Sequence, residues 1–238
     1  MVNTFLVRGN YAESARLLDR QRLGKQRVEA QQILNALEQL RFVAKHLGLP
    51  DFPENQMTPL SDRTNWISKV VSTFNANWSG VWIRERLVVW IPKGGQVPYK
   101  PKGDLYLKDG MVYEKSKTGV VWSGSVGSCL LPDDTYITMG WKSHTAVRMW
   151  LGLEPALRIY INDHIREWIR RGYQNTMPLQ PEDPSAYHPD WARDDSPWIL
   201  CCKQNLLFKE LDRKEPPWYV HMPDFVQLYT LSPEYFWQ

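Results

Sequence analysis

The sequence predicts a mainly α protein, in which a helical core is interrupted by a mixed α/β insert that carries a small antiparallel sheet. Apolar residues recur at helical spacing near both ends of the 238-residue chain. Between residues 51 and 139, prolines break the chain into short stretches. The composition, 43% hydrophobic and 23% charged, is typical of a globular protein. We therefore expect residues 1–50 and 140–238 to form the core and residues 51–139 to form an insert or subdomain.

Two helices are expected in the first fifty residues. The first covers residues 11–20, and the second extends from Leu23 to about Val43. The apolar stripe of the second helix consists of Ala30, Ile33, Leu34, Leu37 and Leu40. Gly48 and Pro50 are the stop signals that end it.

Short stretches within the insert are typical of strands. They are Val81–Ile91, Leu105–Leu107, Met111–Glu114 and Val120–Trp122. Turn signals at Asp109–Gly110 and Lys117–Gly119 separate the last three, which predicts a β-meander.

Helical signals return in the last hundred residues. Ser143 or Thr145 is expected to cap a short helix, and Pro155 suits the first turn of the next one. Gly172 is the expected stop of that second helix. A loop rich in Pro and Trp then leads to a short helix around residues 201–213 and to an aromatic tail.

Several function classes have no support in the sequence. The cysteines, Cys129, Cys201 and Cys202, are an odd number with two adjacent, which predicts a reducing compartment rather than a disulfide framework. No run approaches the ~20 apolar residues of a membrane helix, so we expect a cytoplasmic protein without a membrane partner. Motifs for metal or nucleotide binding (C-x-x-C, H-E-x-x-H, a Gly-rich phosphate loop) are absent, so neither a metal nor any cofactor is expected.

The formal net charge of +3 hides a basic excess near the N-terminus. Arg20, Arg22 and Arg27 belong to it, and guanidinium groups bind DNA phosphates without reading sequence. A solvated basic face is the alternative. Gly24 lies inside the same predicted helix, where glycine costs about 1 kcal/mol relative to alanine unless a large group must approach closely. A DNA backbone is such a group.

Glu29 is the candidate catalytic carboxylate. Helical geometry sets Arg22, Lys25, Glu29 and Gln32 on one edge, which borders the apolar stripe. Ion pairing and partial burial there shift the pKa of Glu29 in opposite directions, a setting found for acid–base and electrostatic catalysts. The alternative is an ordinary surface pair between Lys25 and Glu29.

Three blocks of the sequence, in this order, resemble the pyrimidine-dimer DNA glycosylase (endonuclease V-type) family. The first is Asn3–Leu6 with Leu18–Ala30; the second is Gly140–His144, Ala146–Trp150 and Glu167–Tyr173; the third is Asn205–Leu207, Lys209 and Pro217–Tyr219. The first block is the most specific. The region from Asp51 to Gly140 has no recognised counterpart in the compact members.

The resemblance implies a helical glycosylase core that binds duplex DNA, extrudes a nucleotide at the lesion and cuts the N-glycosidic bond. In compact members the N-terminal α-amine attacks the sugar C1′, forms an imine and breaks the strand by β-elimination, with one glutamate essential. That acid falls on Glu29, which is expected to stabilise the developing oxocarbenium charge. The compact enzymes begin with Thr after Met removal, whereas residues precede Thr4 here. The nucleophile is therefore open among the amine of Met1, that of Val2, Lys25, and water activated by Glu29.

The resemblance also implies contacts to DNA outside the first block. His144 matches a family histidine, and with Arg148 it is expected to contact phosphate or the extruded nucleotide; a structural histidine is the alternative. Lys209, Trp218 and Tyr219 are expected to track or stack on a DNA strand, unless the aromatic tail packs on the core.

We thus expect a DNA N-glycosylase that acts on a damaged or modified pyrimidine in duplex DNA by base flipping, with abasic-site lyase activity left open. One alternative is a glycosylase for a hypermodified phage base, in modification or antiviral defence. Another is a DNA-binding module without catalysis. The expected partner is double-stranded DNA, in the cytoplasm of a bacterial or phage-infected cell.

Overall fold

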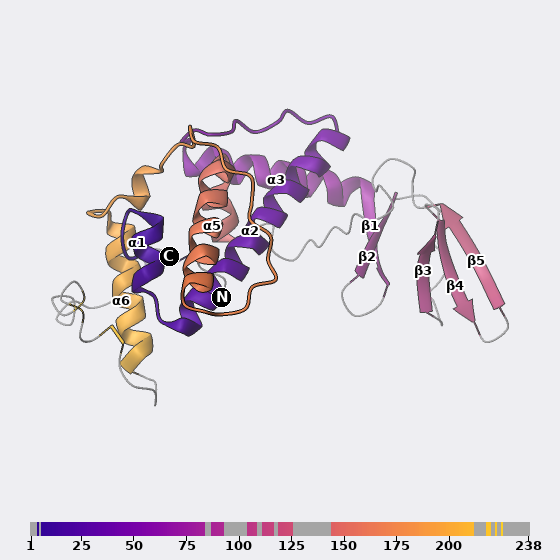
Figure 1. Cartoon of the computed structure of the whole chain (residues 1–238). Coiled ribbons are helices and arrows are strands. Elements are labelled where there is room, and N and C mark those ends of the chain that lie inside the picture. Colours follow the sequence, from indigo (N-terminus) through magenta and orange to yellow (C-terminus); the bar gives the residue numbers. More distant parts are fainter. Residues whose placement is uncertain are drawn as a thin grey trace. The chain divides into compact units, whose positions relative to one another are not determined.

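The computed structural model describes residues 4, 6–83, 87–92, 104–108, 111–116, 119–125, 144–211, 218, 219, 222 and 225. Within these residues the fold is mainly α, as predicted, and contains six α-helices (Figure 1). The backbone forms two compact units: unit 1 comprises Met1–Leu34, Pro53–Met57 and Gly152–Gln238, and unit 2 comprises Asn35–Phe52 and Thr58–Leu151. The division into a core and an insert at residues 51–139 stays a prediction.

Unit 1 is helical in its described residues. It contains α1 (Tyr11–Leu17), the first part of α2 (Arg20–His46), α5 (Glu154–Arg170), the short 3-10 helix η2 (Asp190–Ala192) and α6 (Pro197–Leu211). Helix α1 packs against α5, and η2 packs against α6 (Figure 1). The side chains of Leu157, Ile161 and Ile165 on α5 are fully buried in this unit. This packing sets the position of the first turns of α2.

The chain breaks between α1 and α2 at a different point from the one predicted. We expected one helix to reach Arg20 and the next to begin at Leu23, but α1 ends at Leu17 and α2 begins at Arg20. The reason is Asp19, whose Oδ1 accepts a hydrogen bond of 2.9 Å from the Arg22 amide and so caps α2. Asp19 therefore sets the first turn of α2.

The predicted stop signals act where they were expected. Helix α2 ends at His46 and is followed by Gly48 at φ +66°, a left-handed conformation that favours glycine. Helix α5 has Pro155 in its first turn and is followed by Gly172 at φ +81°. Helix α6 begins at Pro197, before the predicted start at residue 201, because the Ser196 hydroxyl accepts a hydrogen bond of 3.2 Å from the Ile199 amide.

Unit 2 contains a long helix that the sequence analysis missed. Helix α3 (Leu60–Asn77) lies inside the region expected to be the mixed insert. It buries Arg63, Ile67, Val70 and Phe74, which follow helical spacing. The Arg63 guanidinium donates hydrogen bonds to the Met149 carbonyl of α4 (Thr145–Trp150) and, at 3.0 Å, to the Thr58 hydroxyl. A buried arginine among apolar residues thus joins α3 to α4.

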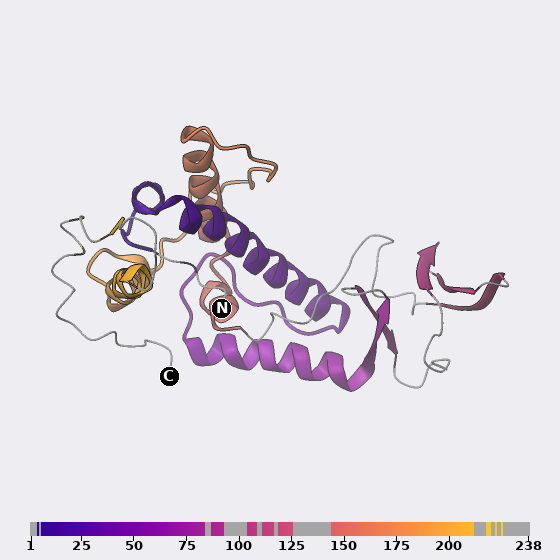
Figure 2. The same ribbon diagram turned by 90° about the horizontal axis from the view of Figure 1, so that it is seen from below.

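Each strand of unit 2 pairs with a strand that is next to it in the sequence, and all of these pairs are antiparallel. They are β1 (Trp78–Ile83), β2 (Leu87–Pro92), β3 (Asp104–Lys108), β4 (Met111–Ser116) and β5 (Gly119–Ser125). Helix α3 leads directly into β1, which pairs only with β2 among the described strands (Figure 2). Strands β3, β4 and β5 pair in consecutive order, with Tyr106 opposite Tyr113. The stretch Val81–Ile91 is divided between β1 and β2.

None of the described helices combines the length and the apolar composition that crossing a lipid bilayer requires.

Candidate active site

Two contacts show how α5 crosses α2 in unit 1. The Tyr160 hydroxyl donates a hydrogen bond of 2.7 Å to Oε1 of Gln26. The indole of Trp168 packs on Gly24, where a methyl group would lie 3.0 Å from its Cζ3 atom. Successive helical residues turn by about 100°, so Gly24 and Gln26 point about 200° apart on α2. The crossing helix therefore contacts α2 on two different sides.

The side with Gln26, which we call the Glu29 flank, carries Arg22, Gln26 and Glu29. Gln26 is only 1% exposed, and its Nε2 lies 3.5 Å from Oε2 of Glu29, at the long end of hydrogen-bond distances. Because Tyr160 fixes the amide oxygen of Gln26, the amide nitrogen points toward the Glu29 carboxylate. Glu29 itself is half-buried. The result is a partly desolvated carboxylate whose neighbour is held in one orientation.

Behind this flank, the Tyr160 ring is fixed by other aromatic side chains. The His164 ring lies 4.0 Å from it, and Tyr11 meets it edge-on at 5.6 Å. His164 is fully buried, and its Nδ1 lies 2.7 Å from the Tyr160 carbonyl oxygen, so Nδ1 carries the proton. Burial lowers the pKa of His164 to about 4. A neutral histidine in the core therefore supports the tyrosine that orients Gln26.

A cavity of about 180 Å³ opens on the other side of Tyr11. It is lined by Gly9, Asn10, Tyr11, Ala156, Ile159, Asp163, Ala186, Tyr187 and His188. The His188 and Tyr11 ring centres are 5.1 Å apart, and burial raises the pKa of the Asp163 carboxyl. The volume is below the roughly 300 Å³ at which small-molecule pockets begin, so the cavity suits a single ring rather than a larger ligand.

The opposite side of α2, which we call the Arg20 flank, is organised by stacked side chains. The Arg27 guanidinium lies 4.3 Å from the Trp168 ring centre, and the Arg20 guanidinium lies 4.9 Å from the Tyr173 ring centre. The Trp168 and Tyr173 rings are themselves 4.4 Å apart. We call these four residues the arginine–aromatic ladder. Arginine favours such stacking because its guanidinium is planar and weakly hydrated.

Hydrogen bonds fix two neighbouring members of the ladder, Arg27 and Trp168. Nη1 of Arg27 donates to Oδ1 of Asn175 at 2.7 Å, and Nε1 of Trp168 donates to the Gln174 carbonyl at 2.7 Å. Gly24 permits this arrangement because it leaves room for the indole. The expectation that a DNA backbone fills the space at Gly24 is therefore wrong, since Trp168 fills it.

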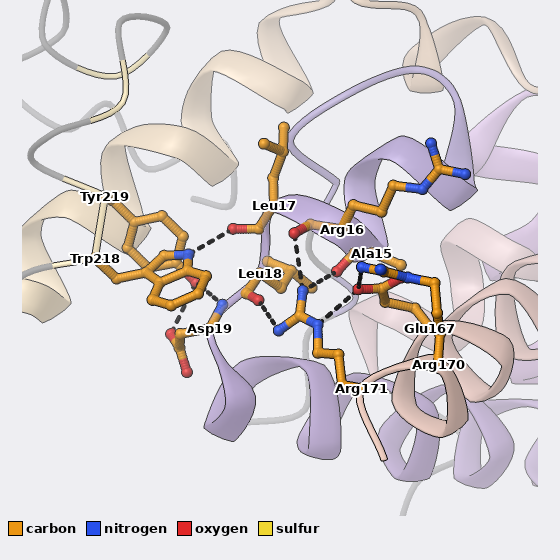
Figure 3. A network of polar contacts seen from close by, with 10 residues as sticks. All are labelled: Ala15, Arg16, Leu17, Leu18, Asp19, Glu167, Arg170, Arg171, Trp218 and Tyr219. Carbon is orange, nitrogen blue, oxygen red and sulfur yellow. Dashed lines mark hydrogen bonds and ion pairs between the residues drawn. The ribbon is translucent and has the colours of Figure 1, made fainter. Parts of the chain in front are cut away.

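The junction that leads into α2 is closed by residues near the C-terminus. Tyr219 is 2% exposed, and its hydroxyl donates a hydrogen bond of 2.8 Å to Oδ2 of Asp19 (Figure 3). Burial raises the pKa of that hydroxyl, and the Asp19 charge raises it further. Trp218 is 44% exposed, and its Nε1 donates to the Leu17 carbonyl at 2.8 Å. Tyr219 thus packs in the interior, as in the alternative to DNA stacking, while Trp218 keeps an exposed ring face.

Comparison with known proteins supports a family assignment. A family model described as pyrimidine dimer DNA glycosylase matches residues 2–181. The chain belongs to this family. The match contains both flanks of α2, the whole of α5 and the ladder residues. No curated protein and no solved structure matches the chain. Membership implies DNA glycosylase activity and binding of damaged DNA.

The structure distributes the other predicted residues of this glycosylase over different elements. Lys25 is an exposed residue of α2. His144 caps α4 in unit 2, where its Nδ1 accepts a hydrogen bond of 3.2 Å from the Ala146 amide. Burial lowers the pKa of His144, and the nearby Arg148 lowers it further. The predicted caps Ser143 and Thr145 are therefore replaced by His144 itself. Arg148 lies one turn later on α4.

Some predicted site residues fall outside what the structure describes. These are Met1, Val2 and the side chain of Lys209. Cys202 is a buried thiol on α6. Among the described residues, no group of three or more His, Cys, Asp and Glu side chains is placed to hold a metal ion.

Sequence reasoning missed the residues that organise both flanks. Tyr160 and Gln26 are 134 positions apart, so no local pattern links them. Tyr173 and Asn175 lie just past the predicted stop at Gly172, and no local pattern links them to α2. The unexplained glycine at position 24 was the one usable signal, because it predicted that a large group approaches the helix there.

Proposed function

We propose that the protein is a DNA N-glycosylase that removes a damaged or modified pyrimidine from duplex DNA, with Glu29 as its essential carboxylate. Family membership supports the activity. The assignment of this role to Glu29 rests on its position beside the Gln26 amide, which Tyr160 holds in one orientation. A carboxylate in such a site is preorganised to stabilise the positive charge that develops on the sugar as the glycosidic bond breaks.

The chemistry has two forms, which differ in the nucleophile. In both, the bond between C1′ and the base nitrogen breaks while a new bond to C1′ forms, and the base leaves with a proton. With water as nucleophile, its oxygen bonds to C1′ and its proton passes to Glu29, which gives a glycosylase without lyase activity. With an amine, the opened sugar forms an imine, and β-elimination of the 3′ phosphate then cuts the strand.

The candidate amines are the terminal amine, on Met1 or on Val2 after Met removal, and the Lys25 side chain. An α-amine has a pKa of about 8, so a useful fraction of it is neutral near pH 7. Lys25 lies one helical turn before Glu29 and is exposed, which favours access. The neutral fraction of an α-amine near pH 7 makes the terminal amine the first candidate.

Both sides of α2 contribute to DNA binding in this proposal. Arg22 shares the Glu29 flank and suits a phosphate beside the reacting nucleotide, whereas Arg20 and Arg27 in the ladder suit phosphates further away. A stacked guanidinium loses less side-chain entropy when it binds a phosphate. A carboxylate on a helix reaches C1′ more readily when the nucleotide is extruded from the stacked duplex, so the proposal includes base flipping.

Cleavage of the N-glycosidic bond in a duplex that contains one thymine dimer tests the activity, with undamaged duplex as the control. Because the cyclobutane ring keeps the detached base joined to its neighbour, the product is detected as an abasic site that alkali converts into a strand break. The proposal predicts such sites in the damaged strand alone. Borohydride then separates the two chemistries, because a covalent protein–DNA adduct requires an amine nucleophile. Cleavage of hypermodified phage DNA alone assigns the enzyme to that substrate instead. Salt-dependent binding without glycosidic cleavage in either DNA would leave a binding module and refute the proposal.

A further inference from the structure

The junction between α1 and α2 is held almost entirely by side chains from distant parts of unit 1. The last carbonyls of a helix lack partners within the helix and need other donors. The Arg171 guanidinium supplies three: Nη2 donates to the carbonyls of Ala15 at 3.2 Å and Arg16 at 2.8 Å, and Nη1 donates to that of Leu18 at 2.8 Å. Trp218 supplies the fourth, to Leu17 (Figure 3). Every carbonyl from residue 15 to 18 thus accepts a side-chain donor from elsewhere.

Arg171 is itself fixed by a nearly buried carboxylate. Its Nε donates to Oε1 of Glu167 at 2.6 Å, and the Glu167 side chain is only 4% exposed. Arg170 binds the same carboxylate through Nε at 2.6 Å and Nη2 at 2.8 Å, and this interaction lowers the pKa of Glu167. The Arg171 guanidinium thereby uses four of its five N–H groups in hydrogen bonds. A lysine cannot reproduce this planar set of donors.

The junction governs the Glu29 flank because a helix transmits a change of direction along its length. Glu29 lies nine residues after Arg20, which corresponds to roughly 13 Å along α2 at 1.5 Å per residue. A tilt of about 5° at the first turn would displace Glu29 by about 1 Å, and a misplacement of that size can cost about 100-fold in rate. The Tyr160–Gln26 hydrogen bond resists part of such a tilt, so a smaller effect is expected.

We propose that Arg171, fixed by Glu167, is a positioning residue that sets the direction of the first turns of α2 and thereby places Glu29 for base excision. The proposal rests on the proposed function for its catalytic part. In this proposal Arg171 acts through the backbone of residues 15–18, since its guanidinium binds the carbonyls of Ala15, Arg16 and Leu18. A purely structural role predicts lower stability with unchanged chemistry in the folded protein, whereas a positioning role predicts slower chemistry with little change in DNA affinity.

The test compares Arg171→Met and Arg171→Lys with Arg166→Met, a matched control that removes an exposed arginine from the same helix. Each variant is assayed well below its melting temperature for single-turnover excision at saturating dimer-containing duplex and for DNA affinity. Amide hydrogen exchange at residues 20–23 is measured alongside. We expect both Arg171 variants to lose about 10-fold or more in excision rate, with affinity within about threefold and faster exchange at residues 20–23. The control should match the wild type.

Rescue by added guanidinium ions distinguishes a positioning role of Arg171 from a general structural defect. Millimolar guanidinium should restore part of the excision rate of Arg171→Met and slow its exchange at residues 20–23, while Arg166→Met should not respond. Wild-type exchange in Arg171→Met, or a wild-type excision rate despite faster exchange, overturns the proposal. A wild-type protein that forms no abasic site in the damaged strand refutes the proposed function instead, and the exchange data then decide alone whether Arg171 orders the start of α2.

Discussion

Replacing Gly24 by alanine measures the contact between α2 and Trp168. Alanine is favoured over glycine inside a helix by about 1 kcal/mol, so the substitution should stabilise an unobstructed helix. Here, however, the added methyl group would lie 3.0 Å from Cζ3 and 3.2 Å from Cη2 of Trp168. Overpacking of this kind costs about 1–3 kcal/mol. The indole cannot easily move away, because Gln174 binds its N–H group and Arg27 and Tyr173 stack against it.

We therefore expect Gly24→Ala to lower the free energy of unfolding by about 1 kcal/mol, the overpacking cost less the gain in helix propensity. In a Trp168→Ala background the obstruction is gone, and the same substitution should stabilise the protein by about 1 kcal/mol. Urea unfolding of the four proteins, followed by circular dichroism, gives the coupling energy, which should be about 2 kcal/mol. Stabilisation by Gly24→Ala in the wild-type background would show that the ladder does not constrain Trp168.

Three further outcomes follow from the buried groups. The pKa of His164 is about 4 in the folded protein and 6.5 in the unfolded chain. As the pH drops, the unfolded chain therefore binds the proton first, and the free energy of unfolding decreases. Between pH 7 and pH 5 this loss is about 2 kcal/mol, so urea unfolding should show the advantage of wild type over His164→Phe shrinking by that amount. Tyr219→Phe leaves Asp19 without its buried donor and should cost about 1–3 kcal/mol in urea unfolding, with DNA affinity measured by fluorescence anisotropy unchanged. Tyr160→Phe frees the Gln26 amide and should slow single-turnover excision about 10-fold without changing affinity; an unaltered rate would separate Tyr160 from catalysis.

Local sequence rules located most of the helices in the described part of the chain. Apolar spacing from Ala30 to Leu40 identified α2, and the stops at Gly48 and Gly172 depend only on the left-handed conformation that glycine adopts there. Trp150 is fully buried, as its position on a central helix suggested. These features are decided within a few residues, so one sequence is enough to find them.

Features that depend on distant partners could not be found in this way. Helix α3 was missed because Pro53 and Pro59 precede it and because a charged residue, Arg63, occupies one of its buried positions. The true partner of Gly24 is 144 positions away, and the sequence signalled only that something large is there. Likewise Tyr219 resembles a surface aromatic of a DNA-binding tail until its hydrogen bond to Asp19 is seen.

The candidate site was predicted in part for the same reason. Helical geometry alone places Arg22 and Glu29 on one edge, but it gives no hint that α5 separates them from Arg20 and Arg27. The basic residues of the first block, which looked like one phosphate-binding face, are divided between two sides of α2.

Single-turnover cleavage of the N-glycosidic bond by Glu29→Gln, followed as abasic sites, tests the central claim most directly. The control is Glu38→Gln, which replaces an exposed glutamate of the same helix. Both proteins should bind a dimer-containing duplex as the wild type does, because the substitution is isosteric. The account predicts that Glu29→Gln loses about 100-fold or more in the rate of glycosidic cleavage while Glu38→Gln keeps the wild-type rate. Equal rates for the two variants would contradict it.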